Sequence, residues 1–184
     1  MVITVQGGKS VRCQLSNFVV TVDPAREGSG NIALKTKTEL PIKWSTEDTI
    51  YGPGEYEISG IKIRGISLSK ESTKEELRTA YTLFMDDLSL CFLGEINADL
   101  DESTFDKLGT PDIVFVSDGK SSTSAKRIAN LVKQLEAKIV IPLGDSPKNL
   151  AEEMGLKPEK SDKLVIKKKD IEESKVKLIW LNEK

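Results

Sequence analysis

In the first half of the chain, short runs of β-branched and other apolar residues alternate with turn residues, and this pattern predicts β-strands. The dipeptide Ser59-Gly60 divides one run into a hairpin, and Asp86-Asp87 joins two further runs in the same way. Asp23-Pro24 ends an earlier strand, because proline cannot continue a strand ladder. The expected strands cover residues 2–5, 11–15, 18–22, 32–35, 49–51, 56–66 as a hairpin, 79–85 and 88–93.

The second half alternates predicted strands with predicted helices. In residues 121–136 the apolar positions follow helical spacing, at Ala125, Ile128, Ala129, Val132 and Leu135. Further helices are expected at residues 101–108 and 146–154, the latter with Gly155 just past its end. Strands are expected at 113–116, at 138–141 before Pro142, at 164–166 and at 176–181. This order, without a long linker, predicts a single layered α/β domain over residues 1–184.

Composition places the chain among globular proteins with balanced charge. Apolar residues make up 38%, charged residues 30%, and the net charge is -2. No basic face is indicated, so a nucleic-acid partner is not expected, and Lys167 to Lys169 are interpreted as a solvated strand edge. The sequence shows no basic leader and no run apolar enough to cross a bilayer. We expect a cytoplasmic protein in which Cys13 and Cys91 are reduced core thiols.

The chain contains no histidine. This excludes Ser-His-Asp and Cys-His catalysis as well as every zinc site that uses imidazole. With two cysteines, a four-cysteine zinc site is also excluded. The segment QGGKS, residues 6–10, lacks the spacing of a phosphate-binding loop and precedes a strand, so it is interpreted as a turn.

Four segments in order along the chain carry a family resemblance. They are TVDP at residues 21–24, GPGEYEISGIKIRGI at 52–66, FLGEI at 92–96 and IVIPLG at 139–144. Together they resemble the metallo-β-lactamase superfamily, in particular its small bacterial and archaeal branch of zinc-dependent hydrolase-like proteins. The resemblance implies an αββα sandwich with the metal site at one edge of its two sheets.

The resemblance also assigns the positions at which that family holds its metal. The family's strand and the His-x-His-x-Asp-His motif into which it leads match residues 32–42, and the first two histidines fall on Lys37 and Glu39. The bridging aspartate falls on Glu95, and the later histidines fall on Asn97 and Gly144. A charged lysine has no acceptor and cannot bind a metal. The resemblance therefore implies the scaffold without its zinc.

From this we expect a non-catalytic protein without a cofactor, which acts as a binding or scaffolding partner of another protein. We also expect the Lys37 ammonium to pair with Glu95 and to replace the cation at a buried site. One alternative is a hydrolase of the same superfamily that holds Mg²⁺, Mn²⁺ or Ca²⁺ by carboxylates. The candidate ligands all follow predicted strands and are Asp23, Glu39, Glu95, Asp118 and Asp145. A second alternative is an accessory protein of nucleic-acid processing.

Overall fold

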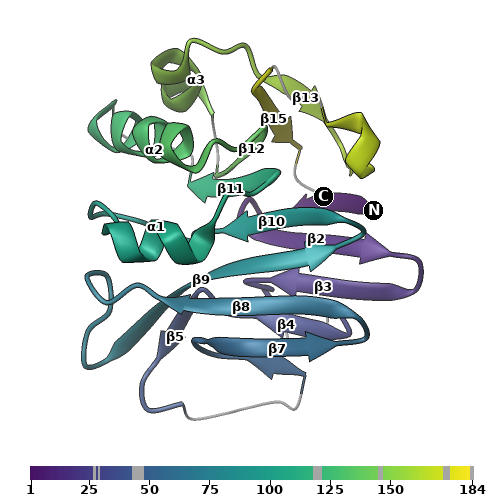
Figure 1. Ribbon diagram of the computed structural model, residues 1–184, viewed down its shortest axis with the longest axis vertical. Helices are drawn as coiled ribbons and strands as arrows, with labels where there is room; N and C mark the ends of the chain where they lie inside the picture. Colours follow the sequence, from purple (N-terminus) through teal and green to yellow (C-terminus); the bar gives the residue numbers. More distant parts are fainter. Residues whose placement is uncertain are drawn as a thin grey trace.

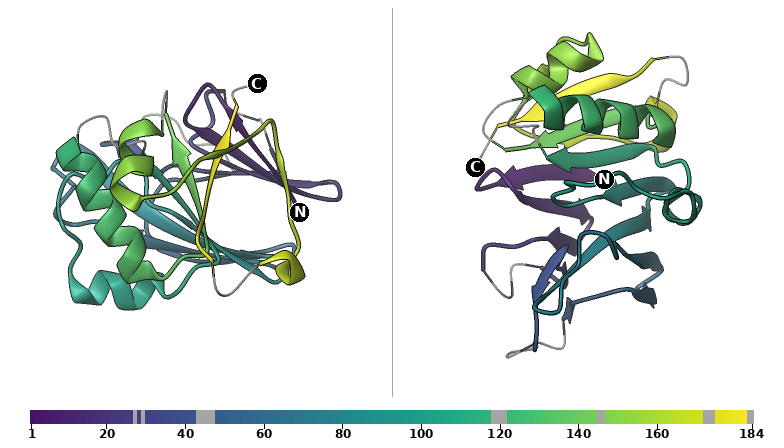
Figure 2. Two further views of the ribbon diagram at one scale, coloured as in Figure 1. Left: turned by 90° about the horizontal axis from the view of Figure 1, so that it is seen from above. Right: turned by 90° about the vertical axis from the view of Figure 1, so that its left-hand side faces the viewer.

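The computed structural model describes residues 1–26, 28, 30–42, 48–117, 122–144, 147–171 and 175–182. Within these residues two β-sheets lie face to face, with helices on one side (Figure 1, Figure 2). The six-stranded sheet has the order β14-β1-β2-β3-β4-β6. The nine-stranded sheet has the order β13-β15-β12-β11-β10-β9-β8-β7, and its remaining strand, β5, pairs with β9. The layered α/β prediction is therefore confirmed.

Most strands lie where the sequence pattern predicts them. The six-stranded sheet contains β1 (Val2–Gln6), β2 (Ser10–Leu15), β3 (Phe18–Val22), β4 (Ile32–Leu34), β6 (Thr49–Ile50) and β14 (Leu164–Val165). The other sheet contains β5 (Lys37–Glu39), β7 (Gly54–Ile58), β8 (Ile61–Ser67), β9 (Glu76–Met85), β10 (Leu88–Phe92), β11 (Ile113–Ser117), β12 (Ile139–Leu143), β13 (Glu159–Ser161) and β15 (Lys177–Leu181). The helices are α1 (Glu102–Leu108), α2 (Ser122–Leu135), α3 (Lys148–Met154) and the 3-10 helix η1 (Lys168–Asp170).

The main core fills the space between the two sheets. Side chains such as Ile3 and Leu34 from the six-stranded sheet pack there against Tyr81 and Leu83 from β9. The rings of Phe92 on β10 and Phe115 on β11 stack with centroids 4.3 Å apart. Burial of this apolar surface is the dominant stabilising contribution to such a sandwich. It holds the two sheets in a fixed relation and so fixes the loops at their ends.

A second core lies between the nine-stranded sheet and the helices. Ile128, Val132 and Leu135 of α2 pack on the outer face of this sheet, where Val114 and Val140 are buried. Among the described residues, all α-helices lie on this side (Figure 2). The outer face of the six-stranded sheet instead carries polar side chains, including Thr4, Arg12 and Gln14, which need no helical cover.

Three local expectations from the sequence are wrong. Residues 32–42 do not form one strand, because the chain leaves the six-stranded sheet after Leu34 and joins β9 of the other sheet as β5. Strand β12 continues through Pro142, where its pairing with β15 has already ended at Val140. Lys168 lies in the 3-10 helix η1, where its ammonium binds the carboxylate of Asp112.

Neither cysteine thiol is accessible. Cys13 lies in the core between the sheets and Cys91 in the core below the helices, and both are free thiols. Burial raises the pKa of each thiol to about 12. Among the described residues, no helix combines the length and apolar character needed to cross a bilayer.

Candidate functional site

A cleft of about 1370 Å³ opens where strands of both sheets reach their carboxyl ends. On one side Glu95 follows β10, Ser117 ends β11 and Gly144 follows β12. These three strands are parallel neighbours in the nine-stranded sheet. The β1–β2 turn, Asp23 after β3 and Lys35 after β4 line the other side. In open α/β sheets, ligands bind outside the carboxyl ends of parallel strands. The cleft is therefore the candidate functional site.

A chain of ion pairs crosses this cleft. Lys9 from the β1–β2 turn donates to Glu95 at 2.7 Å, and Glu95 lies 3.8 Å from the guanidinium of Arg78 on β9. Arg78 also donates to Glu76 of the same strand, and the ammonium of Lys37 on β5 contacts Glu76 at 2.6 Å. Since the β1–β2 turn joins strands of the six-stranded sheet and Glu95 follows a strand of the other sheet, the ion pairs connect the two sheets at the cleft.

Arg78 is the central member of this chain of ion pairs. Its side chain is only 13% exposed, whereas Lys9 and Glu95 are more than half exposed. The Lys37 ammonium, together with Arg78, holds the pKa of Glu76 below its usual value. A guanidinium of this kind bridges two carboxylates with fixed hydrogen-bond directions, which a flexible ammonium does not. The cleft therefore contains its own cations between the carboxylates.

Asp23 forms a separate, largely enclosed group on the cleft wall. Its carboxylate accepts a hydrogen bond from the backbone N–H of Thr36 at 2.8 Å and another from the Thr36 hydroxyl. Burial raises the pKa of Asp23, although these hydrogen bonds and the nearby Lys35 and Arg78 act in the opposite direction. Asp23 also has a positive φ of 49°, a backbone conformation that aspartate adopts more readily than most residues. Its carboxylate links the end of β3 to the crossover between the sheets.

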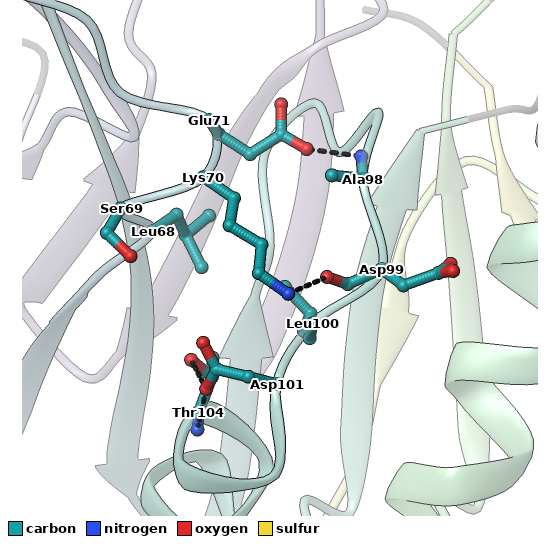
Figure 3. Close-up of a pocket in the computed structure, with 9 residues that line it drawn as sticks. All are labelled: Leu68, Ser69, Lys70, Glu71, Ala98, Asp99, Leu100, Asp101 and Thr104. Atoms are coloured by element: carbon teal, nitrogen blue, oxygen red, sulfur yellow. Dashed lines mark hydrogen bonds between the residues drawn. The ribbon is translucent and has the colours of Figure 1, made fainter.

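The loop after β10 is fixed by Glu71 from the β8–β9 connection. The Glu71 carboxylate accepts hydrogen bonds from the backbone N–H groups of Asn97 and Ala98, and from the Asn97 side chain at 3.3 Å. Figure 3 shows the Glu71–Ala98 hydrogen bond beside a second one, from the Lys70 ammonium to the carbonyl of Asp99. The two connections therefore hold the loop that carries Glu95 into the cleft.

The same loop leads into α1 through a well-formed cap. The Asp101 carboxylate accepts from the backbone N–H of Thr104 at 2.8 Å and from the hydroxyls of Thr104 and Ser103. These bonds, that of the Thr104 hydroxyl first, lower the pKa of Asp101. An N-cap aspartate satisfies N–H groups that have no partner within the helix. The helix predicted over residues 101–108 is present, with Asp101 as its N-cap and Glu102 as its first residue.

The residues that the family resemblance assigns to the metal site come together along the cleft. All of them line it: Lys37, Glu39, Glu95, Asn97 and Gly144. Of the candidate hard-cation ligands, Asp23, Glu39 and Glu95 line the same cleft, whereas Asp118 and Asp145 lie outside the described residues. In the described part of the chain, no three or more Cys, Asp or Glu side chains gather closely enough to hold a metal ion.

The expected pair between Lys37 and Glu95 does not form. Lys37 pairs with Glu76, and Glu95 pairs with Lys9 and Arg78. The expectation of a buried Glu95 is also wrong, since its side chain is 51% exposed. The physical reason is that β5 joins β9, which places Lys37 beside the carboxylates of β9.

The donor set at these positions does not fit zinc. The Lys37 ammonium is a charged donor in an ion pair, the Asn97 amide donates to Glu71, and Gly144 has no side chain. Zinc in proteins is held by thiolates, neutral imidazoles and carboxylates at short distances. We therefore derive no chemical step through zinc for this cleft.

The sequence pattern did not indicate Glu76 or Arg78 as site residues. The start of β9 was expected at Thr79, three residues after Glu76, because the polar residues before it have the composition of a loop. A signal was available in the alternation of Glu76 and Arg78 with Leu77, which is the period of a strand. Charged residues at alternate positions of a strand share one face, and here that face is the cleft wall.

Known proteins share the sequence pattern and the fold of this chain. Residues 2–144 match the family model described as the beta-lactamase superfamily domain. Among solved structures, a putative Zn-dependent hydrolase of the metallo-beta-lactamase superfamily from Thermotoga maritima is similar with a TM-score of 0.76 and 17% identity. The match covers 100% of this chain and 99% of that one. No curated protein matches the chain.

Two further structures share the fold at low identity. The metallo-beta-lactamase fold protein YhfI from Bacillus subtilis has a TM-score of 0.62 at 8% identity, over 99% of this chain and 96% of that chain. The isothiocyanate hydrolase from Delia radicum gut bacteria has a TM-score of 0.63 at 9% identity, over 91% and 100%. The family model, which covers residues 2–144, establishes that the chain belongs to the metallo-β-lactamase superfamily, and the two facing sheets agree with its fold.

Proposed function

We propose that this chain is a non-catalytic member of the superfamily, and that its cleft binds a segment of a partner protein without metal-dependent hydrolysis. The observation that carries the proposal is the chain of ion pairs across the cleft. Its ammonium and guanidinium groups lie between the carboxylates, so the cleft contains positive charge without a metal. Hydrolysis by zinc-activated water requires a bound zinc with an open coordination position.

The shape of the site also supports binding. The cleft is large enough for a ligand or a chain segment, and its walls combine charged residues with the exposed apolar side chains of Leu40 and Ile42. The loops around it lie on a rigid sandwich, which is where binding residues are commonly placed. The loop that carries Glu95 is held by Glu71, so the wall is formed before a partner arrives. Preorganisation of this kind favours binding.

The first test separates binding from turnover. The protein is purified, dialysed against a mild chelator and analysed for metals, and then assayed for esterase, lactamase, phosphodiesterase and nuclease activity with Zn²⁺, Mn²⁺ and Mg²⁺. We expect no stoichiometric zinc and no metal-dependent turnover. Turnover that requires a metal and disappears in the Glu95→Gln variant would refute the proposal.

The second test compares two arginines. Partners are captured from lysate with the wild-type protein, with Arg78→Met and with Arg64→Met as the matched control. Arg64 forms an exposed ion pair with Glu55 away from the cleft, whereas Arg78 lies within it. We expect capture of a specific partner to be lost with Arg78→Met and kept with Arg64→Met. Equal capture by both variants would contradict a role for the cleft.

A second candidate function is a hydrolase with a hard cation, Mg²⁺, Mn²⁺ or Ca²⁺. It is favoured by one observation, that the carboxylates of Asp23, Glu39 and Glu95 line the same cleft. Oxygen ligands of this type suit hard cations. The metal-dependent assays above distinguish the two candidates, because only the hydrolase requires the added ion for turnover.

The proposal also specifies a cellular compartment and a class of partner. Two buried free thiols are consistent with a reducing compartment, so we place the protein in the cytoplasm. The balanced net charge of -2 favours a protein partner over a nucleic acid. An accessory role in nucleic-acid processing would require binding that weakens steeply as the salt concentration rises, and a filter-binding titration with single- and double-stranded DNA tests for it.

A further inference from the structure

Strand β5 has one edge paired and one edge open. Leu40 donates its backbone N–H to the carbonyl of Glu75, and Thr36 accepts from the N–H of Thr79, so the even-numbered residues of this segment hydrogen-bond to β9. In an antiparallel pair, the residues between them direct their N–H and C=O groups away from the partner strand. The backbone groups of Lys37 and Glu39 therefore point outward. Within the described ranges these groups have no hydrogen-bond partner.

This open edge faces the cleft. Strand β8 occupies one side of β9, where Leu68 donates to the carbonyl of Arg78, and β10 occupies the other side. Strand β5 pairs with residues 76–78 of β9 on the β10 side, so by register it continues the line of β10 beyond Gly94. Its outer edge consequently faces the space beyond the end of β11, where Ser117 lines the cleft.

The two faces of β5 differ in character. Lys37 and Glu39 lie on one face, directly opposite Arg78 and Glu76 of β9. Directly opposite residues of this type have Cα atoms about 4.5 Å apart. Glu39 therefore adjoins the like charge of Glu76, and it forms no ion pair with any described residue. A basic side chain placed beside Glu39 would give its carboxylate an ion-pair partner.

The other face of β5 ends in exposed apolar surface. Thr36 and Thr38 are buried on this face, but the next residue of the same parity, Leu40, is 38% exposed, and Ile42 is 44% exposed. Successive residues of an added strand point to opposite faces. A segment with a basic residue beside Glu39 would therefore direct its neighbouring side chain toward Leu40, where an apolar residue removes surface from water.

We propose that the outer edge of β5 is the docking strand for an extended segment of the partner protein, in which a basic residue adjoins a large apolar residue. This inference rests on the proposed partner-binding function and specifies the form and chemistry of the partner. The added segment forms backbone hydrogen bonds with Lys37 and Glu39, places its basic residue beside Glu39, and packs its apolar residue on Leu40. Backbone hydrogen bonds supply affinity in such strand addition, and alternate side chains supply specificity.

The test uses a defined probe, a fluorescein-labelled octapeptide of alternating threonine and valine with a leucine-arginine pair at its centre. Binding is measured by fluorescence polarisation to the wild type and to Glu39→Pro. Proline removes the outward N–H of residue 39 and leaves the hydrogen bonds to β9 in place, because residue 39 makes none of them. We expect the dissociation constant to rise at least about tenfold, which corresponds to ~1.4 kcal/mol.

Charge is tested separately from the backbone. Glu39→Gln keeps the strand edge, and we expect it to weaken binding of the arginine probe and to abolish the salt dependence. A probe with glutamate in place of arginine should bind the wild type poorly. Glu57→Gln on the exposed face of β7 is the matched control and should leave binding unchanged.

Several results would overturn the inference. Equal binding to the wild type and to Glu39→Pro would exclude the strand edge, and so would an unchanged affinity for a probe whose central backbone nitrogens are methylated. If Glu39→Pro does not fold, the methylated probe still tests whether backbone hydrogen bonds to the strand edge are needed for binding. A dimer in sedimentation that Glu39→Pro dissociates would identify a second copy as the occupant instead. Absence of probe binding alongside partner capture that depends on Arg78 would refute the docking strand and leave the proposed function in place.

Discussion

Replacement of Gly94 by alanine tests the packing that places Glu95 in the cleft. Gly94 follows β10 and has a φ of +68°, a left-handed conformation that residues with a Cβ avoid. A Cβ at this position would lie 2.8 Å from the hydroxyl oxygen and 3.0 Å from the Cβ of Thr36. Thr36 cannot move away freely, because its N–H and hydroxyl both bind the carboxylate of Asp23.

The expected loss of stability has two contributions. The left-handed conformation costs alanine about 1 kcal/mol relative to glycine, and the overlap with Thr36 adds about 2 kcal/mol, as overpacking of an enclosed site commonly does. We therefore expect Gly94→Ala to lower the free energy of unfolding by about 3 kcal/mol. A typical domain is stable by about 5–15 kcal/mol, so the variant should remain folded for measurement.

Two other glycines of this chain provide the matched controls. Gly60 has a φ of +77° and Gly155 a φ of +64°, and in each case an added Cβ meets no atom within 4 Å. Gly60→Ala and Gly155→Ala should therefore lose only the backbone contribution, about 1 kcal/mol. Urea denaturation followed by circular dichroism measures all three variants under the same conditions. A loss at Gly94 no larger than at the controls would show that Thr36 does not confine this position.

Three further predictions concern the carboxylates around the cleft and below it. Burial raises the pKa of Asp23, so the folded state binds this proton more tightly than the unfolded state, and the contribution of Asp23 to stability falls as the pH rises from the ordinary pKa of 3.8 through the raised value. Asp23→Asn should flatten this part of the curve of unfolding free energy against pH, measured by urea denaturation. A curve unchanged from that of the wild type would contradict the burial. Asp112 accepts hydrogen bonds from the Ser89 N–H at 2.9 Å and from the Lys168 ammonium at 2.7 Å, so Asp112→Ala should lower the free energy of unfolding by about 2 kcal/mol. The control Lys169→Ala, at the residue after Lys168, should have no measurable effect. Glu71→Ala should increase the hydrogen-exchange rates of the Asn97 and Ala98 amides, which it binds, and exchange at those amides that stays as slow as in the wild type would show that the loop is held by other contacts.

The sequence determined the elements of this fold because their signals are local. Alternation of apolar residues identified β1, β2 and β3, and the turns at Ser59-Gly60 and Asp86-Asp87 fixed two hairpins of the nine-stranded sheet. In a strand, the side-chain period of two is a property of neighbouring residues and needs no knowledge of the partner strand. The absence of histidine is likewise read from the sequence alone, and it excludes a zinc site built on this chain's own imidazoles, whatever fold the chain adopts.

The tertiary structure decided which charges meet in the cleft. Lys9 and Glu95 are separated by 86 residues, and they pair because the β1–β2 turn of one sheet approaches the end of β10 in the other. Lys37 pairs with Glu76 instead of Glu95 because the chain changes sheets between Leu34 and Lys37, a change that no local pattern in residues 32–42 indicates. Ion-pair partners depend on the relative placement of two sheets, which is set by burial of the shared core. A sequence pattern records which side chains are available, and the packing of that core determines which of them lie within hydrogen-bond distance.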